Sequence, residues 1–376
     1  MSFEPNWVSI PGNTIKNILS EREINKNSFA EMLGWNIERV NKLIAGELNI
    51  DENLAIELKQ TLGASTNFWL SRQNNYNLRK KKIELKRVNW INNLPVKEMF
   101  KNDWINKTTN IFEECLSFFN VPDIETWECQ YADILNNTSF RISPSYDSEK
   151  HSIAVWIRRA EIMTNDIKHN IWNKDLFEKK LFTEIKPLTR LKNPAIFIPK
   201  LIKICAECGV LLALVPTIGK CYASGATKLL NKHKALMILS FRYLSDDHFW
   251  FTFFHEAGHL ILHEGHSTRI DCSNIQQTEE TDEEKEANIF SSECLIPYQL
   301  KEELFQLKRN KRAIIEFASK ANVSPGIVVG QLQYHRLIKF EYLNDFKRRF
   351  SWEDINTGIR NSLDNLKFHD LTLNEI

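Results

Sequence analysis

The chain has 376 residues, which is too long for one ordinary hydrophobic core and predicts about two to three domains. Its 49 basic and 48 acidic side chains leave a formal charge of +1, which excludes a uniformly basic coat protein and a highly acidic disordered chain. A local basic patch stays possible, because charges on different domains cancel in the sum. Only 12 glycines accompany 23 phenylalanines, a composition that favours a mostly helical fold over a turn-rich β-sandwich.

Neither a membrane span nor a secretion signal is expected. The longest apolar runs, such as residues 209–215, fall far short of the ~20 residues that cross a bilayer. The first residues, MSFEPNWVSIPGN, lack the basic-then-apolar order of a signal peptide. The seven cysteines show no disulfide framework, so the sequence predicts a protein of the reducing cytoplasm.

Two short helices are expected near the N-terminus, over residues 27–33 and 37–44. Asn27 and Asn36 are expected as the N-caps of the two helices, and Gly34 and Gly46 suit left-handed helix ends. Such a pair with a tight turn is a helix-turn-helix, whose second helix can lie in the major groove of DNA. Its outward polar side chains, the candidates for contacts with bases and phosphates, are Asn36, Glu38, Arg39, Asn41 and Lys42.

The charge of this region leaves DNA binding open. Residues 1–78 carry seven basic and nine acidic side chains, whereas residues 79–87 add six basic and one acidic. Because nucleic-acid affinity depends strongly on positive charge, the helix-turn-helix alone also suits dimerisation or protein docking.

Residues 11–78 resemble the Xre-type helix-turn-helix of HigA-like antitoxin regulators. The resemblance rests on the stretches PGNTIKNILSEREI, SFAEMLGWNIERVNKLIAGELNI, LAIELKQTLGAS and NFWLSRQNNYNL. It implies binding to operator DNA, usually as a dimer. Glu38 stands where that group commonly has a small polar residue, which leaves the base preference open.

The strongest chemical motif is HEAGH at residues 255–259. Residues four apart share one face of a helix, so His255 and His259 can bind the same metal ion. Zinc takes neutral histidine nitrogens and keeps a position for water when only three protein groups bind it. Glu256 can reach that water as a general base and later pass the proton to the leaving amine. Residues 248–263 supply the helix, which is apolar nearly all round and therefore predicted to be buried.

A third metal ligand must come from elsewhere in the chain. The metzincin extension is excluded, because it needs glycine at 262 and histidine at 265, where the sequence has Leu262 and Gly265. The acidic helix start near residue 282 offers Glu284, and Asn288 follows four residues later as a partner for a ligand. The competing carboxylates are those of Glu283 and Glu286.

Stabilising the transition state needs a further hydrogen-bond donor near the developing oxyanion. Two apolar runs, at 210–215 and 235–241, are expected to form strands. The sequence offers Tyr222, in the loop after the first of these strands, and His263, one helical turn beyond His259. A histidine at a helix C-terminus also suits the helix end itself.

Residues 195–340 resemble the ImmA/IrrE family of zinc metallo-endopeptidases. The stretches that carry the resemblance are SGATKLL, ALMILSFRYLSDDHFWFTFFHEAGHLILHEG, EEKEANIFSSECLIP and NVSPGIVVGQLQ. The resemblance implies Zn²⁺ held by His255, His259 and Glu284, with Glu256 as the base. It also implies cytoplasmic action on repressor or antitoxin proteins.

The sequence therefore predicts a mainly α fold with a small β-sheet, of the α+β class.

The expected function is a DNA-binding transcriptional regulator fused to a zinc endopeptidase that cleaves a repressor, antitoxin or other partner protein. Its expected partners are this protein substrate, operator DNA and a second copy in a homodimer, with no membrane. The alternative is a non-enzymatic HigA-like antitoxin or repressor that uses the zincin-like peptidase fold to sense or bind a partner. The predicted parts are 1–78 (helix-turn-helix), 79–190 (basic linker and helical middle), 191–350 (metallopeptidase) and 351–376 (C-terminal tail).

Overall fold

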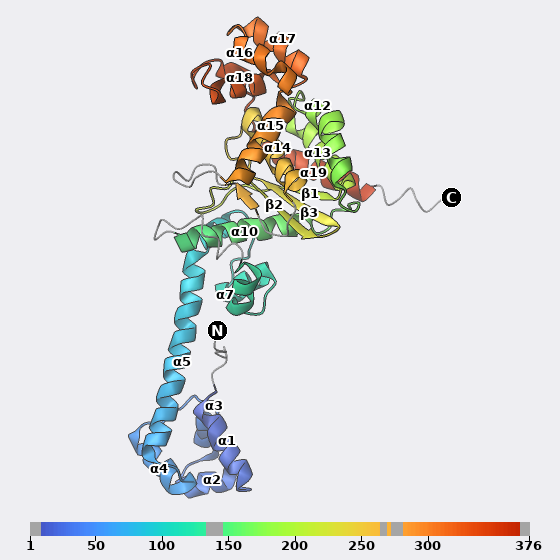
Figure 1. Ribbon diagram of the computed structural model, residues 1–376. Helices are drawn as coiled ribbons and strands as arrows, with labels where there is room; N and C mark the ends of the chain where they lie inside the picture. Colours follow the sequence, from blue (N-terminus) through green and yellow to red (C-terminus); the bar gives the residue numbers. More distant parts are fainter. Residues whose placement is uncertain (1–8, 133–145, 264–268, 272–280, 369–376) are drawn as a thin grey trace, which may run out of the picture. The chain divides into compact units, whose positions relative to one another are not determined.

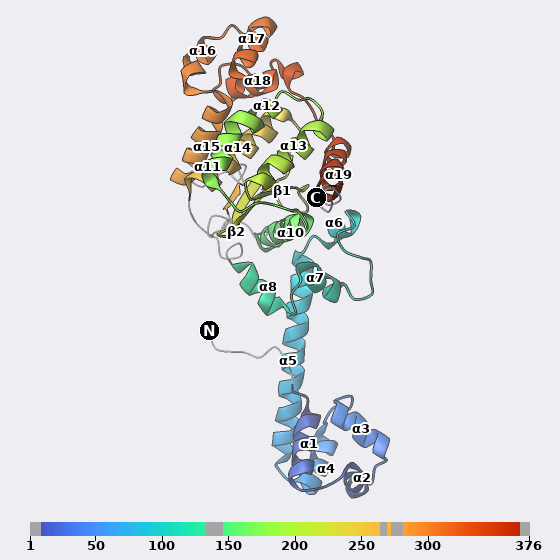
Figure 2. The same cartoon turned by 90° about the vertical axis from the view of Figure 1, so that its right-hand side faces the viewer.

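The computed structural model divides into two compact units, Met1–Asn92 and Asn93–Ile376. The mainly α fold with a small sheet is confirmed (Figures 1 and 2). Among the described residues, no helix has both the length and the apolar character that crossing a membrane requires. The structure describes residues 9–132, 146–263, 269–271 and 281–368.

Five helices build the first unit around one apolar core. Phe29, Val40 and Trp69 lie at its centre with no exposed surface. Trp69 also donates its Nε1 hydrogen to the carbonyl of Gly63 at 3.0 Å, which ties the last helix to the preceding turn. The helices are α1 (Pro11–Glu21), α2 (Lys26–Leu33), α3 (Ile37–Ala45), α4 (Glu52–Leu62) and α5 (Thr66–Asn93).

Capping residues set the turn between α2 and α3. Asn36 accepts the backbone N–H of Arg39 at 2.9 Å, and Gly34 is left-handed with φ of 66°. The cap of α2 is Asn25, which accepts the N–H of Ser28 at 2.9 Å, so the expected cap at Asn27 is wrong by two residues. The first turn of α2 is polar and exposed, and apolar periodicity therefore gives no sign of it.

A four-stranded sheet with the order β1-β3-β2-β4 lies in the second unit. β1 (Val210–Leu214) runs parallel to β3 (Lys234–Leu239), and both are the apolar runs that the sequence shows. β2 (Gly225–Asn231) is antiparallel to β3 and to β4 (Arg269–Asp271). β2 is not expected from the sequence, because its second half is only partly buried and carries no apolar run.

Helices cover both faces of this sheet (Figures 1 and 2). α10 (Tyr146–Thr164) lies on one face, and α13 (Pro194–Glu207) and α14 (Asp246–Leu262) lie on the other. β1 is consequently buried along its whole length. α14 carries the HEAGH motif, so the motif helix packs directly on the sheet.

The remaining helices surround this central layer. α19 (Trp352–Phe368) occupies the segment expected to be a tail, and it packs against α13. The domain boundaries drawn from the sequence stay predictions. The other helices of the second unit are α6 (Val96–Lys101), α7 (Ile111–Phe119), α8 (Ile124–Gln130), α11 (Lys174–Lys180), α12 (Lys186–Leu188), α15 (Asp282–Leu295), α16 (Lys301–Gln306), α17 (Lys311–Ala321) and α18 (Pro325–Tyr334).

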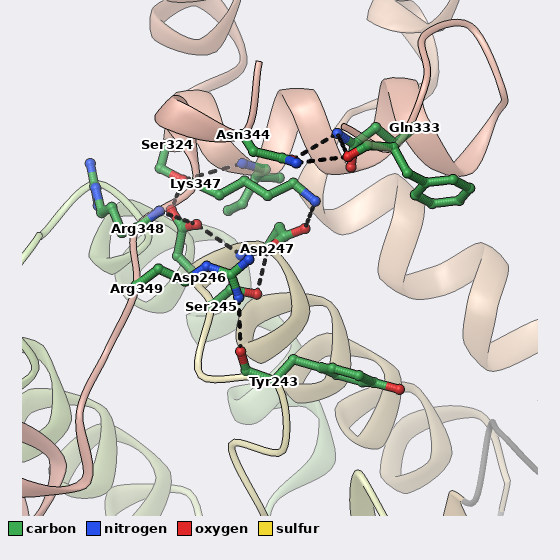
Figure 3. Close-up of polar contacts among 12 residues, drawn as sticks. Tyr243, Ser245, Asp246, Asp247, Ser324, Gln333, Asn344, Lys347, Arg348 and Arg349 are labelled. Carbon is green, nitrogen blue, oxygen red and sulfur yellow. Dashed lines mark hydrogen bonds and ion pairs between the residues drawn. The ribbon is translucent and has the colours of Figure 1, made fainter. Parts of the chain in front are cut away.

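A buried polar cluster fixes the N-terminus of α14 (Figure 3). Asp246 has no exposed surface, and its carboxylate accepts the hydroxyl of Ser324 at 2.7 Å and the backbone N–H of Arg348 at 3.0 Å. Asp247 pairs with the ammonium of Lys347 at 2.6 Å. The start of α18 and the segment around residue 348 therefore hold the first turn of the motif helix.

Asp246 should make stability depend on pH. Burial raises the pKa of Asp246 from 3.8 to about 6. The folded protein then binds this proton more tightly than the unfolded chain, so the free energy of unfolding falls as pH rises from about 4 to 6. Asp246→Asn cannot ionise. The free energy of unfolding of the wild type, measured relative to that of Asp246→Asn, should thus decrease by up to about 3 kcal/mol as the pH rises from about 4 to 6.

Urea unfolding of the metal-free proteins between pH 4 and 7.5 measures this difference. Asp166→Asn, at an exposed carboxyl, is the matched control and should leave the profile of the wild type unchanged. A difference between wild type and Asp246→Asn that stays constant with pH would contradict the prediction.

Candidate metal centre

Two helices carry three side chains that could hold a metal ion. His255 and His259 lie on α14 and Glu284 lies on α15, and one donor atom from each falls within 4.8 Å of the others. The two Nε2 atoms are 3.1 Å apart. The carboxylate oxygens of Glu284 lie 3.2 Å from Nε2 of His255 and 3.3 Å from Nε2 of His259. Within the described ranges, no second group of three such residues is found.

Small residues allow α15 to approach α14 closely enough for this geometry. A Cβ atom on Gly258 would lie 3.3 Å from Cα of Ala287, closer than most real contacts of that kind. Ser291 donates its hydroxyl to the backbone carbonyl of Phe251 at 2.8 Å. Glu284, Ala287 and Ser291 recur at intervals of three and four residues and therefore share one face of α15. A larger side chain at position 258 would move Glu284 away from the histidines.

Hydrogen bonding determines which nitrogen of His255 faces the group. Nδ1 of His255 lies 2.9 Å from the side-chain oxygen of Asn288, as expected from the position of Asn288 one turn after Glu284. An amide oxygen only accepts hydrogen bonds, so Nδ1 carries the hydrogen and Nε2 keeps its lone pair. Asn288 thereby selects the tautomer of His255 that can bind a metal ion.

The protonation states also suit a cation. Burial lowers the pKa of His259 and keeps its imidazole neutral at pH 7. Burial alone would raise the pKa of Glu284, but the two histidine rings next to its carboxylate hold this pKa well below its usual value. A carboxylate and neutral imidazoles form the donor set that zinc takes in three-ligand protein sites.

The spacing of the donor atoms fits zinc. Tetrahedral zinc binds nitrogen and oxygen at about 2.0–2.1 Å, which places neighbouring donor atoms about 3.3 Å apart. The three observed separations are 3.1, 3.2 and 3.3 Å. Three protein donors leave a fourth position for water or substrate.

The carboxylate of Glu256 is confined between α14 and the sheet. Glu256 has no exposed surface, and a Cβ atom on Gly225 of β2 would lie 2.3 Å from its Oε1 atom. Only glycine fits at this point of the strand. Gly225 is not among the site residues expected from the sequence, although a glycine in a strand often marks the close approach of another group.

Of the competing carboxylates, Glu284 alone belongs to the three-residue group. The carboxylate of Glu286 lies 3.7 Å from Nδ1 of His263. Glu283 offers its backbone carbonyl to Nε2 of the same histidine at 3.1 Å. His263 therefore ties the end of α14 to the start of α15.

The two candidate oxyanion donors have different surroundings. His263 is buried and donates to the backbone of α15. Tyr222 is 45% exposed, and its ring lies 5.4 Å from the guanidinium carbon of Arg242. The part of either residue in stabilising a transition state stays a prediction.

The candidate DNA-contacting side chains all lie exposed on α3 or at its cap in the first unit. The guanidinium carbon of Arg39 lies 3.7 Å from the ring centre of Trp35, and Lys42 pairs with Glu38 at 2.8 Å. Their contact with DNA stays a prediction. These exposed residues are Asn36, Glu38, Arg39, Asn41 and Lys42.

Three donors on two packed helices, with the buried Glu256 directly after His255 in the sequence, define a metallopeptidase-like class for this part of the chain. Residues 223–332 match the family model of the IrrE N-terminal-like domain of peptidase family M78. The match includes β2, β3, α14 and α15 and hence every donor of the candidate centre. No curated protein matches the chain. The first unit lies outside the matched residues.

Asn288→Ala should weaken zinc binding about 10- to 100-fold, because His255 loses the hydrogen bond that fixes its ring and tautomer. Competition with a chromophoric chelator on the full-length protein measures the affinity. Ile289→Ala is the matched control, since this neighbour on α15 is 57% exposed. Equal zinc affinity of the two variants would show that Asn288 does not support the centre.

Proposed function

We propose that the second unit is a zinc-dependent endopeptidase that cleaves a repressor, antitoxin or other partner protein in the cytoplasm. The observation that carries the proposal is the convergence of His255, His259 and Glu284. Glu256, which follows His255 in the sequence, is buried and confined against β2. The match of residues 223–332 to a peptidase family supports it.

His255, His259 and Glu284 would hold Zn²⁺, which polarises the scissile carbonyl and makes water more acidic when bound. Glu256 accepts a proton from the attacking water and returns it to the amine nitrogen as the C–N bond breaks. Gly225 has no Cβ atom and therefore leaves room for the carboxylate of Glu256 against β2. Asn288 keeps His255 in the metal-binding tautomer. The products are a carboxylate and an amine, so the atoms of one water molecule balance the reaction.

Glu256→Gln should abolish hydrolysis, with a loss of at least about 100-fold, because the amide cannot accept the proton of water. Zinc content should stay at the wild-type level, since Glu256 is not one of the three donors. The test is digestion of a peptide library by full-length, zinc-loaded protein, read by mass spectrometry, together with elemental analysis of the metal.

Glu286→Gln is the matched control, because it removes a carboxylate near His263 but outside the donor group. Cleavage by Glu256→Gln at the wild-type rate would refute the proposed chemistry. Stoichiometric zinc without cleavage of any peptide by the wild type would favour the alternative, a regulator that uses the peptidase fold to bind a partner.

We further propose that the first unit binds operator DNA through α3, as a homodimer. The supporting observation is that α2 and α3 are joined by a tight turn and that Arg39 and Lys42 are exposed on α3. Stacking over Trp35 limits the conformations of Arg39, which lowers the entropy lost on contact with DNA. The basic residues at 79–87 lie on α5 of the same unit and offer charge for phosphate contacts.

Arg39→Ala combined with Lys42→Ala should reduce DNA affinity at least about tenfold, because base and phosphate contacts of α3 are lost. Fluorescence anisotropy with DNA fragments that the wild type selects from genomic DNA measures the effect. Lys16→Ala combined with Lys59→Ala removes the same charge from exposed positions on α1 and α4 and serves as control. Unchanged affinity of the α3 variant would identify the helix-turn-helix as a docking module.

A further inference from the structure

A row of rings begins beside the candidate metal centre and runs along the surface of the second unit. Phe251 on α14 lies 6.3 Å from the ring of His255 and 6.3 Å from the ring of Tyr334 at the end of α18. His335 follows at 5.2 Å from Tyr334, and Phe305 of α16 lies 5.1 Å from His335. Phe251, Tyr334, His335 and Phe305 are called the aromatic row below.

The aromatic row is exposed and uncharged. Tyr334 is 60% exposed and Phe305 is 40% exposed, while Phe251 and His335 are partly buried. Burial and the charge of Lys301 lower the pKa of His335, so its imidazole is neutral at pH 7. Contiguous exposed rings are unfavourable in water and mark surfaces that bind an apolar partner.

The fold holds the aromatic row in a fixed position relative to the metal centre. α18 runs along the first half of α14 and contacts it at successive points. Ser324 bonds to Asp246 (Figure 3), and a Cβ atom on Gly330 would lie 2.9 Å from Asp247. Tyr334, farther along α18, then lies beside Phe251. Phe251 therefore shares α14 with the donors His255 and His259, and the contacts of α18 with α14 hold Tyr334 next to Phe251.

We propose that the aromatic row is a substrate subsite that binds an aromatic or large aliphatic side chain of the cleaved protein. This inference rests on the peptidase function proposed above. Two ring-to-ring steps of 6.3 Å separate Tyr334 from the donor His255. An extended peptide advances about 3.3 Å per residue. A substrate side chain that contacts Tyr334 therefore belongs to a residue within about four positions of the scissile bond. Rings without a compensating charge select apolar side chains over acidic or basic ones.

Continuity with the metal centre favours a peptide as the occupant of the aromatic row. The row starts at Phe251, one helical turn from the donor His255, so an extended segment bound along the rings reaches the reacting position. A second copy of this chain is the competing occupant, and the experiment distinguishes the two.

The test compares Tyr334→Ala/Phe305→Ala with the control Tyr298→Ala/Ile315→Ala in full-length, zinc-loaded protein. The control removes side chains that are 70% and 51% exposed and take no part in the row. The probe is a set of dodecapeptides with Phe, Leu, Ala, Glu or Lys at each position. We expect the wild type and the control to cleave peptides with Phe or Leu near the scissile bond at least about tenfold faster than their Ala versions. The row variant should lose this preference but still cleave the Ala peptides.

Binding of the same peptides to zinc-loaded Glu256→Gln protein, with and without the row substitutions, gives a readout that needs no cleavage. Cleavage without an apolar preference, or a preference that survives in the row variant, overturns the subsite and leaves the peptidase function intact.

If the wild type cleaves nothing, the peptidase function fails. Tighter binding of Phe peptides than of Ala peptides, lost on substitution of the row, still supports the binding site in that case. Equal binding of Phe and Ala peptides overturns it. A wild-type dimer that the row substitutions dissociate in sedimentation also overturns it, in favour of a second copy.

Discussion

The contact between Gly258 of α14 and Ala287 of α15 is the constraint on which the candidate metal centre depends. The spacing of the HEAGH motif brings two donors together on one helix, but the third lies on another helix. Its distance from the histidines is set by how closely the helices pack. The same contact brings Asn288 to His255, so one packing interaction sets both the donor geometry and the tautomer of a donor.

The burial of α14 imposes a second demand, because polar groups in an apolar interior are costly unless they have partners. The surrounding elements supply several of these partners. Ser324 satisfies Asp246, Lys347 neutralises Asp247, and Asn288 bonds to His255. The polar groups of this helix therefore help to determine how α15, α18 and the segment near residue 348 pack around it.

Sequence reasoning succeeded where neighbouring residues determine the structure. The pairing of His255 with His259, the cap at Asn36 and the apolar strands β1 and β3 all follow from local spacing or composition. It left the choice among the carboxylates of α15 open, because helical phase alone does not fix the depth to which one helix packs on another. It did not identify Gly225, since the approach of β2 to Glu256 joins residues far apart in the chain.

The scarcity of glycine, which first indicated a helical fold, also locates the site. Among the glycines of the described ranges, four lie where α14 meets another element, and none of the four has the positive φ that would itself require glycine. Gly225 faces Glu256, Gly326 and Gly330 face Asp246 and Asp247, and Gly258 faces α15. A Cβ atom would clash with or crowd the helix at each point, so these glycines are needed for space rather than for conformational freedom. In this glycine-poor chain, the four glycines thus mark the points at which other elements pack most closely against α14.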